Sequence, residues 1–319
     1  MQTSHAVRRT LLIFTAMLAI SFCSQAQDAA PAATVPVHIT VTVNVVGEGK
    51  KMPDLDRRDI MVRQHKDRLQ VTDWFPATGD HAGMQLFVLI DDASDSSLGS
   101  QLDDVRAFIN AQPPTAAVAV GYMSNATVRV VQDFTTDHAL AVKAVRVPLA
   151  NTGAYGSPYL SLIDALKRWP ESPNRREVLM VTDGIDRARG GFRSQRLGPV
   201  PDVDTASDVA QRTGTIIYTI YSPGVGRLFR NYWVANNAQN ALARLSEETG
   251  GESFYLGLQS PVSFKPYLEQ VQKMLDNQYI VGFLAKPGHK SGLQEVKITT
   301  EVPGVEFAAA NSVWVPVAK

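Results

Sequence analysis

Cysteine is almost missing from this sequence of 319 residues, because Cys23 is its only one. Cys23 lies at the end of an apolar N-terminal run that has the character of an export signal, so we expect the mature chain to contain no cysteine. Disulfide bonds and thiolate chemistry are then excluded from its function. Export without disulfides points to a bacterial envelope protein or a secreted one.

The sequence also has no excess of positive or of negative charge. The 31 basic residues equal the 31 acidic residues in number, and the lysines and arginines are scattered rather than clustered. The sequence therefore lacks the basic patch that binds nucleic acid. An apolar fraction of 45% is ample for a buried core, so we expect a globular chain.

Motifs of common catalytic centres are also missing. The chain contains neither a Gly-x-Ser-x-Gly turn nor a Gly-x-x-x-x-Gly-Lys-Ser/Thr phosphate loop, and no pairing of a nucleophile with a base stands out. The histidines are dispersed, without the spacing of zinc ligands. We expect a protein that is not an enzyme.

The N-terminus reads as a signal peptide over residues 1–26. Arg8 and Arg9 precede an apolar run from Leu11 to Phe22, and the small residues of Ser24-Gln-Ala26 offer a cleavage site. The run is too short for a membrane span. Lipid attachment at Cys23 is the less favoured outcome, because a bulky residue precedes it. We expect a periplasmic or secreted protein.

The middle of the chain, residues 84–285, alternates apolar strands with amphipathic helices. This order predicts an α/β domain with a doubly wound, mostly parallel sheet between helices. Strands are expected at 86–90, 116–122, 126–134, 178–182, 215–221 and 278–284, and helices at 98–110, 160–169, 205–213, 237–248 and 262–275.

Both ends of the mature chain have β character instead. After a Pro/Ala-rich linker at 27–34, apolar and polar residues alternate in the unit 35–78, and they do so again in the C-terminal segment 290–319. We expect these two segments to pack together as one small β-sandwich beside the α/β domain.

Two predicted strands of the middle segment end in acidic residues. The first runs into Asp92-x-Ser94-x-Ser96, and the second ends at Asp183, followed by Gly184. The carboxyl ends of parallel strands meet at the edge where open α/β folds bind ligands. Carboxylate and hydroxyl oxygens suit a hard divalent cation there.

These motifs resemble the von Willebrand factor type A (VWA) domain and its metal-ion-dependent adhesion site. Further features lie along nearly the whole mature chain: an N-terminal strand of Val-x-Val type, Asp59-Ile-Met-Val62, Leu245-Ser-Glu-Glu-Thr-Gly-Gly251, Asn277-Gln-Tyr279 and the C-terminal β segment. Together with the first motif they resemble the VWA-related family named from acidobacterial genomes. The resemblance implies a VWA/Rossmann-like fold and a Mg²⁺ ion, with Mn²⁺ or Ca²⁺ as alternatives. The implied ligands are Asp92, Ser94, Ser96 and Asp183, the last binding directly or through water.

The resemblance leaves three positions open. Asp91 competes with Asp92 for the place at the strand end. Ser157 is the best match for a further hydroxyl ligand, with Thr152 and Ser161 as alternatives. Asp95 stands where the adhesion site usually has a glycine, and its carboxylate could fill the place meant for a partner.

The function implied is an exported, metal-dependent module for protein–protein interaction, in adhesion or assembly. Hydroxyl ligands leave the ion electrophilic, so a carboxylate from a protein partner would complete its shell. The alternative is a structural scaffold with a degenerate, metal-free site. We expect neither a nucleic-acid partner nor a membrane span after signal removal.

Overall fold

The computed structural model describes residues 34–47, 52–151, 156–188, 201–225, 231–259 and 261–317. These ranges lie in one compact unit, residues 33–319. The predicted signal peptide, nearly all of the linker and Thr152 lie outside the described residues. No described helix is long and apolar enough to cross a membrane.

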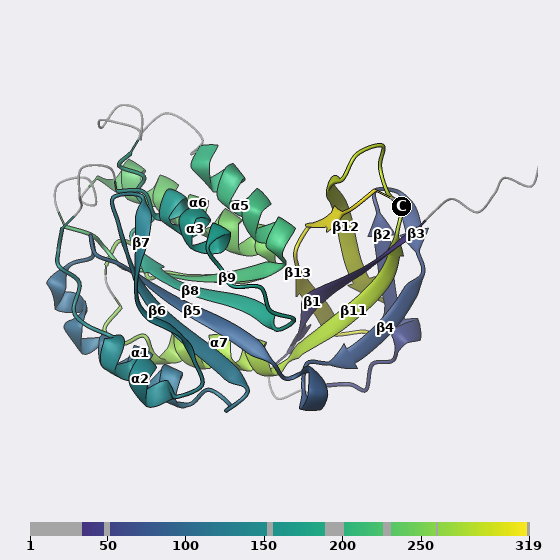
Figure 1. Cartoon of the computed structure of the whole chain (residues 1–319), viewed down its shortest axis with the longest axis horizontal. Coiled ribbons are helices and arrows are strands. Elements are labelled where there is room, and N and C mark those ends of the chain that lie inside the picture. Colours follow the sequence, from purple (N-terminus) through teal and green to yellow (C-terminus); the bar gives the residue numbers. More distant parts are fainter. Residues whose placement is uncertain are drawn as a thin grey trace, which may run out of the picture. The chain divides into compact units, whose positions relative to one another are not determined.

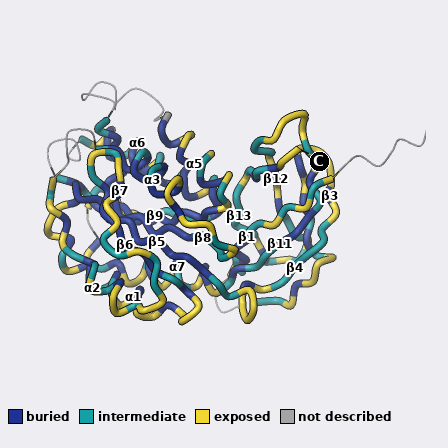
Figure 2. Tube along the Cα trace, viewed as in Figure 1, coloured by how far each residue is buried: buried dark blue, intermediate teal, exposed yellow. Residues whose placement is uncertain are grey.

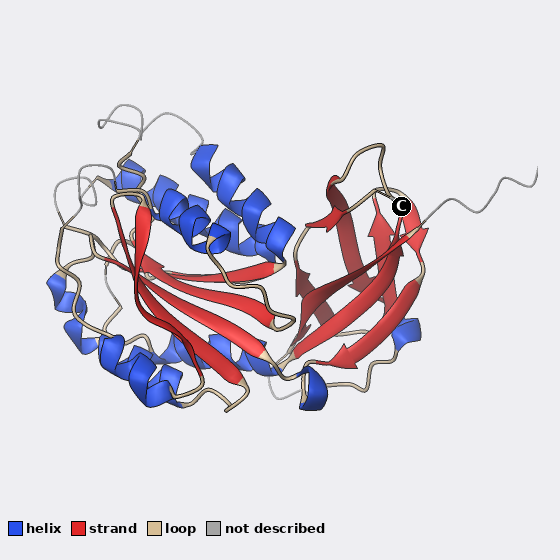
Figure 3. Ribbon diagram, viewed as in Figure 1, coloured by secondary structure: helices blue, strands red, loops and turns tan. Residues whose placement is uncertain are grey.

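A six-stranded sheet forms the centre of the α/β domain (Figure 1, Figure 3). Five neighbouring strands, β10, β9, β8, β5 and β6, are parallel to one another. The sixth strand, β7, lies at the edge beside β6 and is antiparallel to it. In spatial order the strands are β10 (Ser253–Phe254), β9 (Thr215–Tyr221), β8 (Arg175–Thr182), β5 (Met84–Asp91), β6 (Ala116–Ser124) and β7 (Thr127–Thr135).

Helices cover both faces of this sheet, as the side view in Figure 1 shows. Alternate residues of β5 supply the two cores, because successive side chains of a strand point to opposite faces. Leu86, Val88 and Ile90 face one core, whereas Phe87 and Leu89 face the other. The first core also holds α1 (Leu102–Asn110), α2 (His138–Ala144) and α7 (Lys265–Asp276), and the second holds α3 (Pro158–Lys167), α5 (Pro201–Thr213) and α6 (Tyr232–Thr249).

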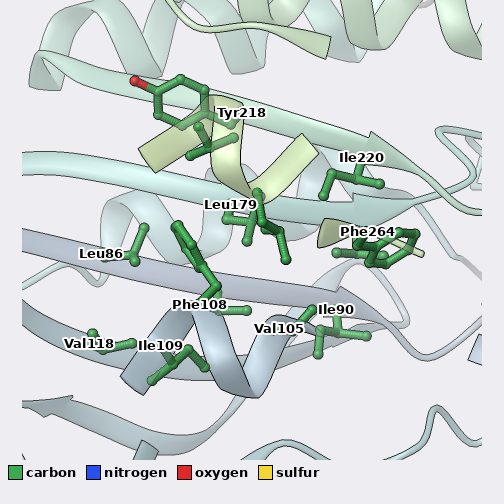
Figure 4. Packing of buried hydrophobic residues seen from close by; sticks show 14 of the residues in the cluster. Leu86, Ile90, Val105, Phe108, Ile109, Val118, Leu179, Tyr218, Ile220 and Phe264 are labelled. Atoms are coloured by element: carbon green, nitrogen blue, oxygen red, sulfur yellow. The ribbon is translucent and has the colours of Figure 1, made fainter. Parts of the chain in front are cut away.

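The first core is continuous from the sheet to the helices. Figure 4 shows Val105 and Phe108 of α1 beside Leu86 and Ile90 of β5, and Figure 2 shows that the sheet interior is buried throughout. Burying apolar area at about 25 cal/mol per Å² is the main favourable term in such a fold. The apolar runs of the strands are continuous, as expected when helices cover both faces.

The chain ends form the predicted β-sandwich. One sheet has the order β13-β1-β11-β4 and the other β14-β12-β2-β3, and their inner faces share one apolar core. The N-terminal unit supplies β1 (Val35–Val45), η1 (Arg57–Asp59), β2 (Ile60–Gln64), β3 (Asp67–Leu69), β4 (Val71–Pro76) and η2 (Gly79–His81). The C-terminal segment supplies β12 (Gly292–Thr300), β13 (Val305–Ala309) and β14 (Ser312–Val315). The predicted fold class, with both chain ends in one sandwich, is confirmed.

One strand, β11, lies in the β-sandwich and not in the α/β domain, where the sequence places it. β11 (Gln278–Ala285) was assigned to the α/β domain at 84–285, but it lies between β1 and β4 of the sandwich. Its antiparallel partner is the N-terminal strand, with Val35 opposite Ala285 and Thr42 opposite Gln278. Periodicity identifies a strand but not its partners, which is why the sequence places β11 in the wrong sheet. In the structure the chain leaves the α/β domain after α7 and enters the sandwich with β11.

Candidate functional site

Two acidic residues meet at the carboxyl edge of the six-stranded sheet. Asp91 is the last residue of β5, and Asp183 directly follows β8, its parallel neighbour. The chain continues from β5 to β6 on one side and from β8 to β9 on the other. This pair of strands is therefore the point where strand order reverses, which is where open α/β sheets bind ligands.

Asp91 takes the strand-end position that the sequence analysis assigned to Asp92. Its Oδ2 accepts a hydrogen bond from Thr182 Oγ1 at 2.7 Å, and its Oδ1 accepts one from Ala93 N at 2.9 Å. Burial, and then the nearby charge of Asp183, raise the pKa of Asp91 to about 6. The alternative register that the sequence left open is the one the structure has.

Asp92 points away from this pair and serves a different contact. Both of its carboxylate oxygens bind the Arg146 guanidinium, at 2.8 and 2.9 Å, and Leu149 N donates to Oδ1 at 3.2 Å. Arg146 also lies over the Tyr122 ring, 3.7 Å from its centroid. Asp92 thus holds the connection after α2 against the sheet edge.

Asp183 is fully buried and faces an arginine four residues further along. Its two carboxylate oxygens bind the two terminal nitrogens of Arg187, and Oδ1 also accepts a hydrogen bond from Ile185 N at 2.9 Å. The Arg187 side chain is only 10% exposed. Local sequence pattern does not predict this pair, because a spacing of four residues brings side chains together on a helix and residues 183–187 form none.

Of the predicted hydroxyl ligands, Ser157 and Ser94 lie at this edge and Ser96 is exposed. Ser157 lies at the site, where it caps α3 by accepting from Leu160 N at 3.3 Å, and it lines a small cavity with Asp91, Ser161 and Arg187. Ser94 is buried, whereas Ser96 is exposed at the start of η3 (Ser96–Ser100).

Asp95 takes no part in the site. Its side chain is exposed and caps η3 by accepting a hydrogen bond from Ser97 N at 2.8 Å. That hydrogen bond lowers the pKa of Asp95. The carboxylate is therefore not placed to substitute for one from a partner.

A short loop after β9 closes over the two acids. Val225 N donates to Ala93 O at 2.9 Å, and Ser94 forms an isolated antiparallel bridge with Gly224. A Cβ built on Gly224 would overlap the Asp183 carboxylate, so only glycine allows the loop this close. The site at the switch point is covered.

The donor set does not fit the divalent ion that the resemblance implies. Asp92 is engaged by Arg146, Ser96 is exposed on η3, and Asp183 is engaged by Arg187. Within the described part of the chain, no three His, Cys, Asp or Glu side chains gather in a way that could hold a metal ion. The arrangement instead compensates buried carboxylates with hydrogen-bond donors and an arginine.

Large apolar side chains are exposed on connections and on the start of α6 at the same edge of the sheet. Trp233 is 59% exposed and Val262 is 91% exposed. They lie on segments that follow β9 and β10, and further members lie beside Asp92 on the connection from α2 to α3. We call this set the apolar rim: Val147, Leu149, Tyr232, Trp233, Tyr255, Leu256 and Val262.

Comparison with known proteins gives structural matches only. No family model matches the sequence, and no curated protein matches it. Similar solved structures include VWA domains. A von Willebrand factor type A structure from Catenulispora acidiphila has a TM-score of 0.46 at 10% identity, covering 90% of this chain and 75% of that one. The SpRpn10 VWA domain has a TM-score of 0.39 at 13% identity, covering 59% of this chain and 94% of that one.

A third match is an aerotolerance-related membrane protein from Bacteroides fragilis, with a TM-score of 0.41 at 12% identity. It covers 61% of this chain and 99% of that one. The matches thus include the domain type that the sequence resembles.

Proposed function

We propose that this chain is a protein-binding module whose partner docks on the apolar rim, at the carboxyl edge of the six-stranded sheet. The observation that carries the proposal is the exposure of tyrosine, tryptophan and aliphatic side chains on connections, and on the first turn of α6, at the edge that holds the switch point. Tyrosine and tryptophan are enriched among the few residues that supply most of the binding energy at protein interfaces. The partner we propose is a folded protein with an apolar surface.

The shape of the apolar rim favours a protein partner. Tyr232 and Trp233 pack edge to face, with ring centroids 5.7 Å apart, at the start of α6. Leu256 and Val262 lie on another connection, and Leu149 on a third. Separate anchors of this kind suit the pockets of a protein surface, with polar contacts between them.

The acids at the switch point favour binding over catalysis and over metal dependence. Asp91 is engaged by Thr182 and Ala93, and Asp183 by Arg187 and Ile185. Neither acid is therefore offered to a substrate or to a partner. We propose that docking needs no divalent ion, in place of the ion-dependent adhesion that the sequence resemblance implies.

The test is capture by crosslinking with matched variants. The full mature chain is mixed with envelope extract in chelator, crosslinked, and compared with Trp233→Ser and with Leu140→Ser, which removes an apolar side chain that is 44% exposed on α2. We expect one set of partners with the wild type and with Leu140→Ser, and its loss with Trp233→Ser. Equal capture by all three chains, binding to phospholipid vesicles instead, or capture that requires Mg²⁺ would overturn the proposal.

We also propose that residues 1–26 direct export and are then removed. The support is the short apolar run after Arg8 and Arg9 and the small residues before Gln27. Mass spectrometry of the protein from its native host should show an N-terminus at Gln27. A lipid-modified Cys23 or a retained Met1 would contradict this.

A further inference from the structure

Two acids are buried at the carboxyl ends of neighbouring strands, and burying two negative charges side by side costs free energy. Asp91 is 6% exposed and Asp183 is 0% exposed, and the charge of Asp183 contributes to the raised pKa of Asp91. A buried carboxylate without a cation or several donors is strongly destabilising. A positive group beside this pair offsets that cost in addition to the hydrogen-bond donors.

Arg187 supplies a positive charge beside these acids. Its guanidinium binds both oxygens of Asp183, with Nη1 to Oδ1 at 3.1 Å, and the fork of an arginine matches a carboxylate in this way. The same side chain lines the small cavity that Asp91 and Ser157 also line. The volume left there is about 10 Å³, which is roughly the room for one water molecule.

We infer that Arg187 is a built-in cation: its guanidinium takes the place beside Asp91, Asp183 and Ser157 that a divalent ion would need, and so makes this site independent of metal. The inference goes beyond the proposed function and does not depend on partner binding.

The local backbone holds the arginine in place. Arg187 N donates to Gly156 O at 2.6 Å, which ties the turn after β8 to the segment just before α3. Tyr159 OH donates to Gly184 O at 2.9 Å from inside the core. Gly184 itself has a φ of +67°, so the chain reverses sharply after Asp183 and Arg187 folds back upon it.

The loop after β9 lies close to both the arginine and its acid. Gly224 lies against the Asp183 carboxylate, and a Cβ built there would also be 3.0 Å from Arg187 Nη2. The arginine thus balances the charge of Asp183 in a tightly packed part of the edge.

The test is metal titration of the purified, chelator-treated chain and of three variants. Wild type should show no heat by calorimetry and no change of melting temperature with millimolar Mg²⁺, Mn²⁺ or Ca²⁺. Arg187→Ala should melt lower, because Asp183 is left without its cation, and Mn²⁺ should raise its melting temperature by a few degrees. Arg187→Ala combined with Asp183→Asn should lose that response.

Arg146→Ala is the matched control, because it breaks the other Asp–Arg pair of this edge and should gain no response to metal. Metal-dependent stabilisation of the wild type would overturn the inference, and so would a folded Arg187→Ala that ignores Mn²⁺. If Arg187→Ala fails to fold, Arg187→Gln, which keeps a hydrogen-bond donor beside Asp183 without the charge, takes its place in the titration. Loss of partner capture, by contrast, concerns only the proposed function.

Discussion

The Arg146 guanidinium meets the Asp92 carboxylate in two parallel hydrogen bonds, Nη1 to Oδ1 at 2.8 Å and Nη2 to Oδ2 at 2.9 Å. The Asp92 side chain is only 7% exposed, whereas that of Arg146 is 32% exposed. The pair therefore fastens the connection between α2 and α3, which carries two members of the apolar rim, to the end of β5. The placement of Val147 and Leu149 therefore depends on this contact.

Replacing Arg146 by alanine should lower the free energy of unfolding by about 2 to 3 kcal/mol, because it leaves a nearly buried carboxylate without its cation. Urea unfolding followed by circular dichroism measures the change. Lys265→Ala is the control, since its pairing with Glu269 is long, at 3.9 Å, and exposed, and should cost at most about 0.5 kcal/mol. Equal effects of the two substitutions would contradict the structural role of Arg146.

Thr182→Val should also destabilise the chain, by about 1 to 2 kcal/mol. The hydroxyl donates to Asp91 Oδ2 and accepts from Gly184 N at 3.1 Å, and valine preserves the shape without either bond. Thr127→Val, at an exposed position of β7, serves as the control and should be nearly neutral. A neutral Thr182→Val would show that Asp91 does not need this donor.

Gly184→Ala tests the turn that places Arg187. Gly184 has a φ of +67°, and an added Cβ would lie 2.8 Å from Leu242 Cγ and 3.0 Å from Ala238 O. Gly214 has a similar φ of +64° but open space around it, so Gly214→Ala measures the backbone strain alone. We expect a cost of about 1 kcal/mol at Gly214 and about 2 to 3 kcal/mol at Gly184, by thermal unfolding.

Glu177 gives the fold a dependence on pH far from the switch point. It lies near the start of β8, and burial raises its pKa to about 8 from an ordinary value of 4.5. Between these two values the folded chain holds a proton that the unfolded chain has lost, so stability falls as pH rises through this window and then levels off. Below the window both states are protonated, and the penalty is absent.

Glu177→Gln should remove this fall and leave the variant more stable than the wild type at pH 9 by about 2 kcal/mol or more. Melting temperatures at pH 5, 7 and 9 measure it. Glu247→Gln, at an exposed position of α6, should follow the wild-type profile. A profile of Glu177→Gln that falls in parallel with the wild type would refute the assignment.

The sequence by itself determined the elements and the edge at which the site lies. Apolar periodicity placed the strands and most helices, because burial of one face imposes the repeat. The acids at the ends of two apolar strands located the switch-point edge. Apolar periodicity did not identify the short elements. β10 spans only Ser253–Phe254 and α2 has seven residues, so both are too short to show a clear repeat.

Only the tertiary structure decided which side chains meet. Asp91 and Asp92 are equivalent in sequence, but successive strand residues face opposite sides, so Asp91 follows Leu89 toward α3 and Asp92 follows Ile90 toward α2. The pairing of Arg187 with Asp183 requires the reversal at Gly184, and that of Asp92 with Arg146 joins residues 54 positions apart. Two charged side chains pair when folding brings them close together. That proximity depends on which strands become neighbours, and the local sequence pattern does not specify the neighbours.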